Sequence, residues 1–199
     1  VSSDNFGLGR IAAEGLSAHM PTGAEVGVLG FAADFFATNE REIAFTKWLQ
    51  VNRPDVTPRV RRFARIEDAA ASADDLLSAN PDLAGLFIVW DTPALAAATR
   101  LAERGATMPM ATVDLGEAAA IALAQGDSFC CIAAQQPFLQ GIAAAQTVIL
   151  CLLGRPVPAW IALPGIGVTR DNVVESFQTI WRQPAPREVL RMLGLSRGT

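Results

Sequence analysis

The stretch GLFIVWDTPALAAATRLAERGATMPMATVD, residues 85–114, decides the fold of this chain. Its first apolar run, 85–90, is short and continuous, as in a strand that is buried on both faces of a parallel sheet. Residues 93–104 follow with helical character; a proline stands at the first turn and a glycine just past the end. A second apolar run closes the stretch at 109–114. Strand, helix and strand at this spacing predict a right-handed βαβ unit.

The same alternation continues in both directions from this unit. Toward the N-terminus, the pattern predicts strands at 25–31 and 58–63 and helices at 7–20, 39–52 and 66–80. Toward the C-terminus, it predicts a helix at 116–125, a strand at 128–133, a helix at 137–153, extended segments at 159–163 and 165–169, and helices at 171–181 and 187–195. Asn39 is the expected cap of its helix, with Glu42 completing a capping box. The fold class is therefore α/β, with a doubly wound parallel sheet.

Composition excludes some classes of protein. The chain is 51% hydrophobic and 18% charged, which favours a large buried core over disorder. Its net charge is −4, and the basic residues form no long run, so nucleic acid is not an expected partner. The group Arg59, Arg61, Arg62 and Arg65 is better explained by a strand with a solvated edge. No apolar run approaches the roughly 18 residues of a membrane helix.

The residues of common enzyme sites are missing. Cys130, Cys131 and Cys151 have neither metal-ligand nor disulfide spacing and are expected to be small buried hydrophobes. His19 is the single histidine, so a transition-metal cluster or a catalytic triad has too few members. Nucleophile-elbow, phosphate-loop and complete dinucleotide-loop motifs do not occur. We expect no enzyme activity, no cofactor and no metal.

Polar and aromatic residues instead recur just past the ends of predicted strands, where parallel α/β sheets bind their ligands. The candidate ligand-binding residues are Asn5, Arg41, Phe63, Trp90, Asp114 and Gln135. Their neighbours at the same strand ends are Asp4, Asp34, Phe35, Phe36, Arg65, Asp91 and Gln136. Amide, carboxylate and guanidinium groups can each make paired hydrogen bonds, and aromatic rings cover C–H faces. This set suits a small polyhydroxyl ligand.

Each candidate also has a purely structural alternative. Asn5 can cap the first helix, and Asp91 and Asp114 can cap the helices that they precede. Arg41 can form a surface ion pair with Glu40 or Glu42. Phe63 and Trp90 can be core aromatics. The repetition of such residues at strand ends favours the binding site.

Two features indicate that part of the protein lies outside this sequence. The predicted helix 137–153 is apolar nearly all round, and a helix of that kind has to be covered on most sides. The chain also opens on VSSDN, with no strand of its own before the first helix except residues 1–3.

A set of motifs in fixed order resembles a known family. The matching stretches are SSDN at 2–5, TNEREIAF at 38–45, FARI at 63–66, NPDLAGLFIVWD at 80–91, MATVD at 110–114, AAQQPFLQG at 133–141 and VTRDNV at 168–173. Together they resemble the periplasmic sugar-binding proteins of ABC transporters, the type I or ribose-binding-like family, over nearly the whole chain. In that family, Asn5, Arg41, Phe63, Asp114 and Gln135 fall on sugar-contacting positions. Trp90 falls where ribose binders commonly have asparagine, which argues against ribose itself.

The resemblance implies two Rossmann-like lobes joined by three crossing segments. Residues 1–134 would be the second lobe, with the first hinge at 1–5; residues 135–164 would be a hinge and a segment of the first lobe; residues 165–199 would be the return crossing, last helix and tail. Most of the first lobe would be missing, whether cleaved, disordered or present as a separate chain. The fragment alone should then bind weakly.

The implied function is capture of a small sugar or polyol in the periplasm by closure of the two lobes, followed by docking on a membrane permease. Two alternatives share features of the sequence. One is the effector-binding core of a LacI-like transcription regulator, which has the same fold. The other is an α/β enzyme of flavodoxin-like or aldolase-like type, against which the missing catalytic residues weigh.

Overall fold

A six-stranded sheet forms the centre of the molecule in the computed structural model, which describes residues 1–195. Its strands are β2 (Glu25–Phe31), β3 (Thr57–Phe63), β4 (Leu83–Ile88), β5 (Met110–Val113), β6 (Phe129–Ala134) and β8 (Ile166–Val168). They lie in the order β3-β2-β4-β5-β6-β8, all parallel except β8, which pairs with β6 in the antiparallel sense. The predicted α/β fold is confirmed, and the antiparallel edge strand is an addition to it.

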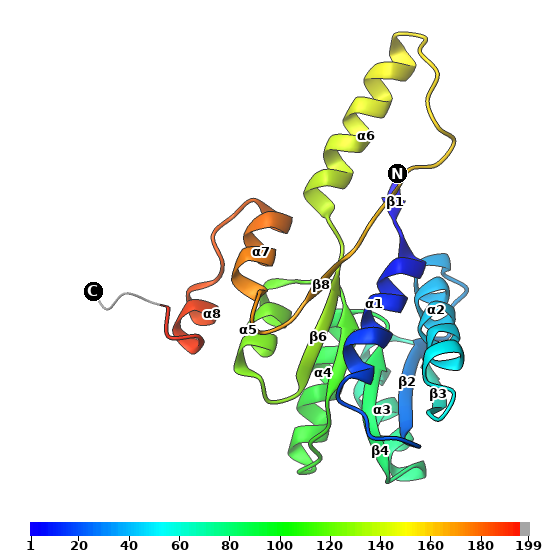
Figure 1. The fold of residues 1–199 in the computed structure, drawn as a ribbon, viewed down its shortest axis with the longest axis vertical. Helices are drawn as coiled ribbons and strands as arrows, with labels where there is room; N and C mark the ends of the chain where they lie inside the picture. The colour runs from blue at the N-terminus through cyan, green and yellow to red at the C-terminus, as the bar shows by residue number, and fades with distance from the viewer. Residues whose placement is uncertain (196–199) are drawn as a thin grey trace.

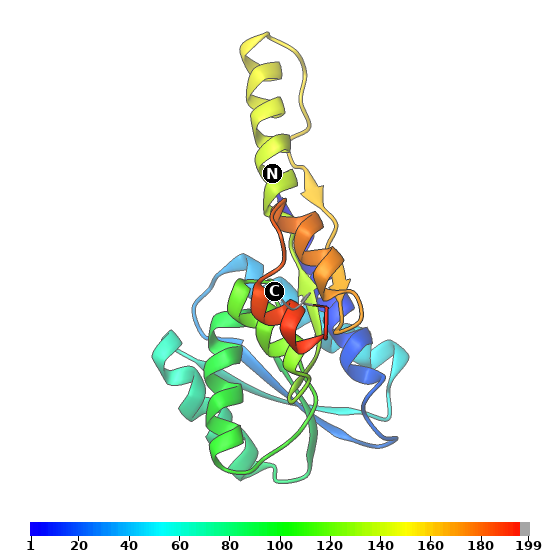
Figure 2. The same ribbon diagram turned by 90° about the vertical axis from the view of Figure 1, so that its left-hand side faces the viewer.

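Helices cover both faces of this sheet (Figures 1 and 2). They are α1 (Asn5–Ser17), α2 (Phe36–Asn52), α3 (Ala69–Ala79), α4 (Asp91–Glu103) and α5 (Glu117–Gln125), with a short 3-10 turn η1 (Ile66–Asp68) before α3. Helices α1 and α2 pack on each other, α3 packs on α4, and α4 on α5. Two further helices, α7 (Val173–Trp181) and α8 (Arg187–Met192), lie against α5. The carboxyl ends of β2, β4 and β5 are thus held on a rigid, covered sheet.

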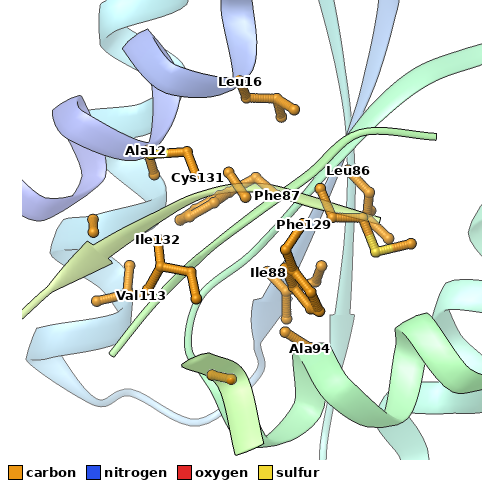
Figure 3. Close-up of a cluster of buried hydrophobic side chains, with 14 of the residues drawn as sticks. Ala12, Leu16, Leu86, Phe87, Ile88, Ala94, Val113, Phe129, Cys131 and Ile132 are labelled. Carbon is orange, nitrogen blue, oxygen red and sulfur yellow. The ribbon is translucent and has the colours of Figure 1, made fainter. Parts of the chain in front are cut away.

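The core fills the space between sheet and helices with large apolar side chains (Figure 3). Residues of β4, β5 and β6 meet Ala12 and Leu16 from α1 and Ala94 from α4. The rings of Phe45 and Phe87 stack 4.2 Å apart at the α2–β4 contact. Burial of each side chain of this size stabilises the fold by about 1.5–3 kcal/mol. Cys131 belongs to this core, as expected, and packs against α1.

One helix leaves the body of the molecule. Helix α6 (Pro137–Leu152) projects away from the sheet, beside the chain's N-terminus (Figure 1). None of its residues is buried, and Leu152 is 82% exposed, so its apolar surface is uncovered within residues 1–195. The prediction that Cys151 is buried is therefore wrong for the chain as described, because this cysteine lies on the uncovered helix. Below α6, β1 (Ser2–Ser3) and β7 (Ala162–Leu163) form a separate parallel pair.

The predicted start of α2 is also wrong. The helix begins at Phe36, three residues before Asn39, with Phe35 as the residue that caps it. Asn39 donates a side-chain hydrogen bond to Asp34 Oδ1 at 2.9 Å, and Glu42 pairs with Arg62 instead of closing a capping box. The helix thus begins without a side-chain cap. The capping rule placed its start too late because the rule looks for a polar cap residue.

Three members of the arginine group, Arg59, Arg61 and Arg62, lie on edge strand β3 as predicted, whereas Arg65 lies two residues past its end. The three pair with carboxylates on neighbouring elements: Arg59 with Glu25, Arg61 with Asp75, and Arg62 with Glu42. In the described part of the chain, no helix has the length and apolar character needed to cross a membrane. Of the predicted tail, residues 196–199 lie outside the described residues.

Candidate ligand-binding cleft

A cleft of about 540 Å3 opens at the carboxyl ends of β2, β4 and β5. This is the edge at which parallel α/β sheets place their ligands, because strand ends and helix starts converge there. Its lining residues come from the N-terminal segment with β1, α1, α2, the strand ends and the start of α6: Val1, Ser2, Ser3, Asn5, Phe31, Phe35, Phe36, Ala37, Thr38, Arg41, Ile66, Trp90, Asp114, Gln135 and Gln140.

Arg41 lies at the centre of the polar side and is 5% exposed. Its Nε donates to Asn5 Oδ1 at 3.1 Å, and its Nη1 donates to the Val89 carbonyl at 3.0 Å. Nη1 also lies 3.5 Å from Asp114 Oδ2. Burial lowers the pKa of Arg41, and the Asp114 carboxylate opposes that shift; the ordinary value is high enough that the guanidinium stays charged. The alternative of a surface pair with Glu40 or Glu42 is wrong.

The network continues through Asp114 to β1 and the start of α6. Gln135 donates from Nε2 to Asp114 Oδ1, and its Oε1 accepts from Ser3 Oγ at 2.6 Å. Gln140 Nε2 donates to Ser3 Oγ at 2.5 Å. These bonds join β1, the end of β6, α6 and the end of β5 into one polar system that faces the cleft.

Two groups of this network keep hydrogen-bond donors for a ligand. Arg41 uses Nε and Nη1 on protein partners, and Asn5 accepts with its oxygen. No residue in the described range accepts a hydrogen bond from Arg41 Nη2 or Asn5 Nδ2. The Arg41 guanidinium and the Asp114 carboxylate offset each other in charge. The polar side therefore suits a neutral ligand with several hydroxyl groups.

Aromatic side chains supply the apolar part of the lining. The ring centroid of Trp90 lies 5.2 Å from that of Phe31, edge to face, and 5.3 Å from that of Phe63. Phe35 and Phe36, both about half exposed, pack on each other around the start of α2 and line the same cleft. Aromatic faces of this kind cover the C–H groups of a ligand without needing hydrogen bonds.

The structure brings five of the six candidate residues to the cleft. Asn5, Arg41, Trp90, Asp114 and Gln135 line it. Phe63 does not: it is 1% exposed and packs behind Phe31 and Trp90, as in its core-aromatic alternative.

Neither Asn5 nor Asp91 caps the helix that its structural alternative assigned to it. Asp4, and not Asn5, caps α1, with its Oδ1 accepting from the Gly7 amide at 2.9 Å. Asp91 is the first residue of α4 and does not cap that helix. Its carboxylate reaches across to the start of α5, where Oδ2 accepts from the Gly116 amide at 3.0 Å.

Ser3, Phe31 and Gln140 line the cleft but were not among the candidates. Ser3 comes from the two-residue strand β1, outside the main sheet, and Gln140 comes from α6, so the strand-end rule for the main sheet includes neither. Phe31 is the last residue of β2, where the rule does apply, but it belongs to the apolar run by which that strand is recognised. In the described residues, no group of three or more His, Cys, Asp or Glu side chains could hold a metal ion.

Residues 1–156 match the family model of the periplasmic binding protein domain. The chain belongs to this family. The search of curated protein sequences found no match to this chain, whereas 196 chains of solved structures match it.

Among those structures is an ABC-transporter solute-binding protein from Mycobacterium smegmatis with bound glycerol: it is 26% identical, with a TM-score of 0.76, and 89% of this chain and 62% of that chain are covered. A solute-binding protein from Agrobacterium vitis with bound allitol is 25% identical, with a TM-score of 0.73, covering 89% and 64%. Another from Agrobacterium vitis, bound with α-D-tagatopyranose, is 22% identical, with a TM-score of 0.81, covering 92% and 62%. The chain thus spans less than two thirds of the length of these proteins.

Proposed function

We propose that the chain is the greater part of a solute-binding protein that captures a small neutral sugar or polyol for import by an ABC transporter. The observation that carries this proposal is the mixed lining of the cleft. Asn5 and Arg41 keep free donors there, and Trp90 and Phe31 contribute aromatic surface. Membership of the periplasmic binding protein domain family supports it, and so do neighbours bound to glycerol and allitol.

The mechanism would be closure of two lobes around the ligand. Residues 1–134 would form the second lobe, and residues 135–164 a hinge with a segment of the first. Ser3 and Gln135, which would lie on two crossing segments, are hydrogen-bonded to each other at 2.6 Å, so the hinge and the cleft would share one network. A ligand that contacts both lobes would favour the closed state by its differential affinity for that state.

The uncovered apolar surface of α6 fits the same arrangement. In the complete protein it would pack on the rest of the first lobe, whether that lobe is continuous with this chain, cleaved from it or a separate polypeptide. The closed form would dock on a membrane permease, and the family implies an extracytoplasmic place for the protein. No observation on residues 1–195 favours a transcription regulator or an enzyme.

Isothermal titration calorimetry with glycerol, allitol, D-tagatose and D-allose tests this function on the chain and on any longer form of the protein. Neutral polyols or sugars should bind, weakly to the chain alone because the facing wall of the cleft would belong to the rest of the first lobe. D-allonate, the acid formed when C1 of D-allose is oxidised to a carboxylate, should bind less well than D-allose and allitol. Binding of the anion and of none of the neutral compounds would overturn the proposal.

A further inference from the structure

A short loop carries Asp114 into the cleft in a conformation that needs support. Asp114 has φ +74°, in the left-handed region that residues other than glycine adopt rarely and at a cost of about 1 kcal/mol or more. Such a conformation persists only where the surroundings hold it. The Asp114 amide donates to the Ala133 carbonyl at 3.0 Å, which fixes the first residue of the loop. The backbone of the next two residues, Leu115 and Gly116, is hydrogen-bonded by side chains that come from outside the β5–α5 connection.

Two side chains hold the loop, one on each side of it. Asp91, at the start of α4, accepts from the Gly116 amide at 3.0 Å. Trp181, the last residue of α7, donates from its indole Nε1 to the Leu115 carbonyl at 2.7 Å. A Cβ on residue 116 would lie 2.9 Å from Asp91 Oδ2, so glycine permits this close approach.

The Leu115 side chain is buried in the core, but packing leaves open space beside the rest of this loop. A second cavity of about 210 Å3 lies beside it, lined by Asp91, Asp114, Leu115, Gly116, Gln135, Pro137, Ile180 and Trp181. Asp114 and Gln135 line both this cavity and the main cleft. Because the space beside the loop is open, the loop can relax into it once a hydrogen bond is lost.

We infer that Asp91 and Trp181 are positioning residues that clamp the loop 114–116 and so aim the Asp114 carboxylate at Arg41 and Gln135. The inference rests on the proposed function in so far as Asp114 faces the ligand. Asp91 does not line the main cleft, and neither does Trp181. They act through the backbone of Leu115 and Gly116.

The clamp also connects the ligand side to α6. Arg182, next to Trp181, places its guanidinium carbon 5.6 Å from the centre of the Phe138 ring at the start of α6. The end of α7 therefore contacts the Asp114 loop on one side and α6 on the other. A movement of α6 relative to the sheet would change the support of Asp114 directly.

NMR on the 199-residue chain tests the clamp without any ligand. The variants are Asp91→Ala, which removes the acceptor, and Asp91→Asn, which keeps an acceptor oxygen but no charge. Glu117→Ala is the matched control, because it removes an exposed carboxylate one residue after Gly116. Hydrogen exchange of the Gly116 amide should accelerate about tenfold or more in Asp91→Ala, stay within about threefold in Asp91→Asn, and be unchanged in the control.

The chemical shift of the Gln135 side-chain amide reports the position of the Asp114 carboxylate, to which that amide is hydrogen-bonded. If Asp91 only stabilised the fold, this chemical shift would not change. The signal should shift in Asp91→Ala and return in Asp91→Asn. Trp181→Phe, which keeps an aromatic ring but removes the donor, should shift it too, and this variant tests the clamp even if Asp91→Ala does not fold. The inference is overturned if the exchange rate of the Gly116 amide is unchanged in Asp91→Ala or is not restored in Asp91→Asn. It is also overturned if the Gln135 signal does not shift in Trp181→Phe.

Calorimetry with allitol and glycerol adds the functional readout. Asp91→Ala should weaken binding about fivefold or more, with Asp91→Asn close to the original chain. Equal affinities in all three, with binding intact, would contradict the positioning role. If the original chain binds neither compound nor any of the sugars above, the proposed function fails, while the NMR measurements still decide whether the clamp exists.

Discussion

Replacing Arg41 by methionine is the sharpest test of the polar side of the cleft. Methionine keeps much of the aliphatic stem but none of the donors, so Asn5 Oδ1 and the Val89 carbonyl lose their partner. Two hydrogen bonds from a charged donor are together worth about 3–6 kcal/mol. Removal of the buried charge offsets part of this, since burial is the main cause of the lowered pKa of Arg41. The net loss of stability should be about 2 kcal/mol.

Urea unfolding followed by circular dichroism measures this loss. With a slope of about 2 kcal/mol per molar urea, the midpoint should fall by about 1 M. Arg59→Met is the matched control, because Arg59 pairs with Glu25 on the exposed edge of the sheet and such pairs contribute about 0–1 kcal/mol. The reasoning is refuted if the two variants lose the same stability within about 0.5 kcal/mol.

A double-mutant cycle with Asn5→Ala separates the contact from its surroundings. Because Arg41 and Asn5 are hydrogen-bonded at 3.1 Å, their substitutions should not add, and the coupling should be about 1 kcal/mol. In binding, Arg41→Met also removes the free Nη2 donor, which should weaken the affinity for a bound polyol about tenfold or more. Additive losses, or an unchanged affinity in a chain that binds polyol, would show that Arg41 does not organise the cleft.

Three further predictions concern charge, thiols and ligand choice. Burial, aided by the charge of Asp114, raises the pKa of Asp91 above its ordinary value of 3.8. The folded protein then holds that proton more tightly than the unfolded chain, so ionised Asp91 costs stability above the raised pKa; Asp91→Asn should unfold at higher urea than the original chain near pH 7, with the gap narrowing as the pH falls toward 4. Iodoacetamide at neutral pH should modify Cys151 alone, because Cys151 is exposed while burial raises the pKa of Cys130 to about 11 and of Cys131 to about 12; a mass shift of two or three adducts on the folded chain would contradict this. A ligand hydroxyl placed against the Trp90 ring loses its bound water without gaining a hydrogen-bond partner. D-fucose, which lacks the 6-hydroxyl of D-galactose, should therefore bind better than D-galactose, and Trp90→Asn should reduce or reverse that preference in competition calorimetry.

Local patterns determined much of this fold. Each apolar run became a strand because a strand buried on both faces needs apolar residues throughout, and residues 85–114 did form strand, helix and strand. The ends were less accurate, since α2 begins at Phe36 without a side-chain cap. The strand-end rule brought Asn5, Arg41, Trp90, Asp114 and Gln135 to one cleft, because parallel strands end on the same edge of the sheet.

Only the tertiary structure decided what these residues contact. Phe63 and Trp90 both follow strands in the sequence, yet Phe63 is covered by its aromatic neighbours and Trp90 faces the cleft. Ser3 and Gln140 meet Gln135 because β1 and the start of α6 lie side by side, although they are far apart in the sequence. The sequence by itself determined the parallel part of the sheet, the edge at which the cleft lies and most of the residues on that edge. These features follow from periodicity and chain direction. The hydrogen bonds from Asp91 and Trp181 to the Asp114 loop depend on where separate helices end in space, and no local pattern encodes that.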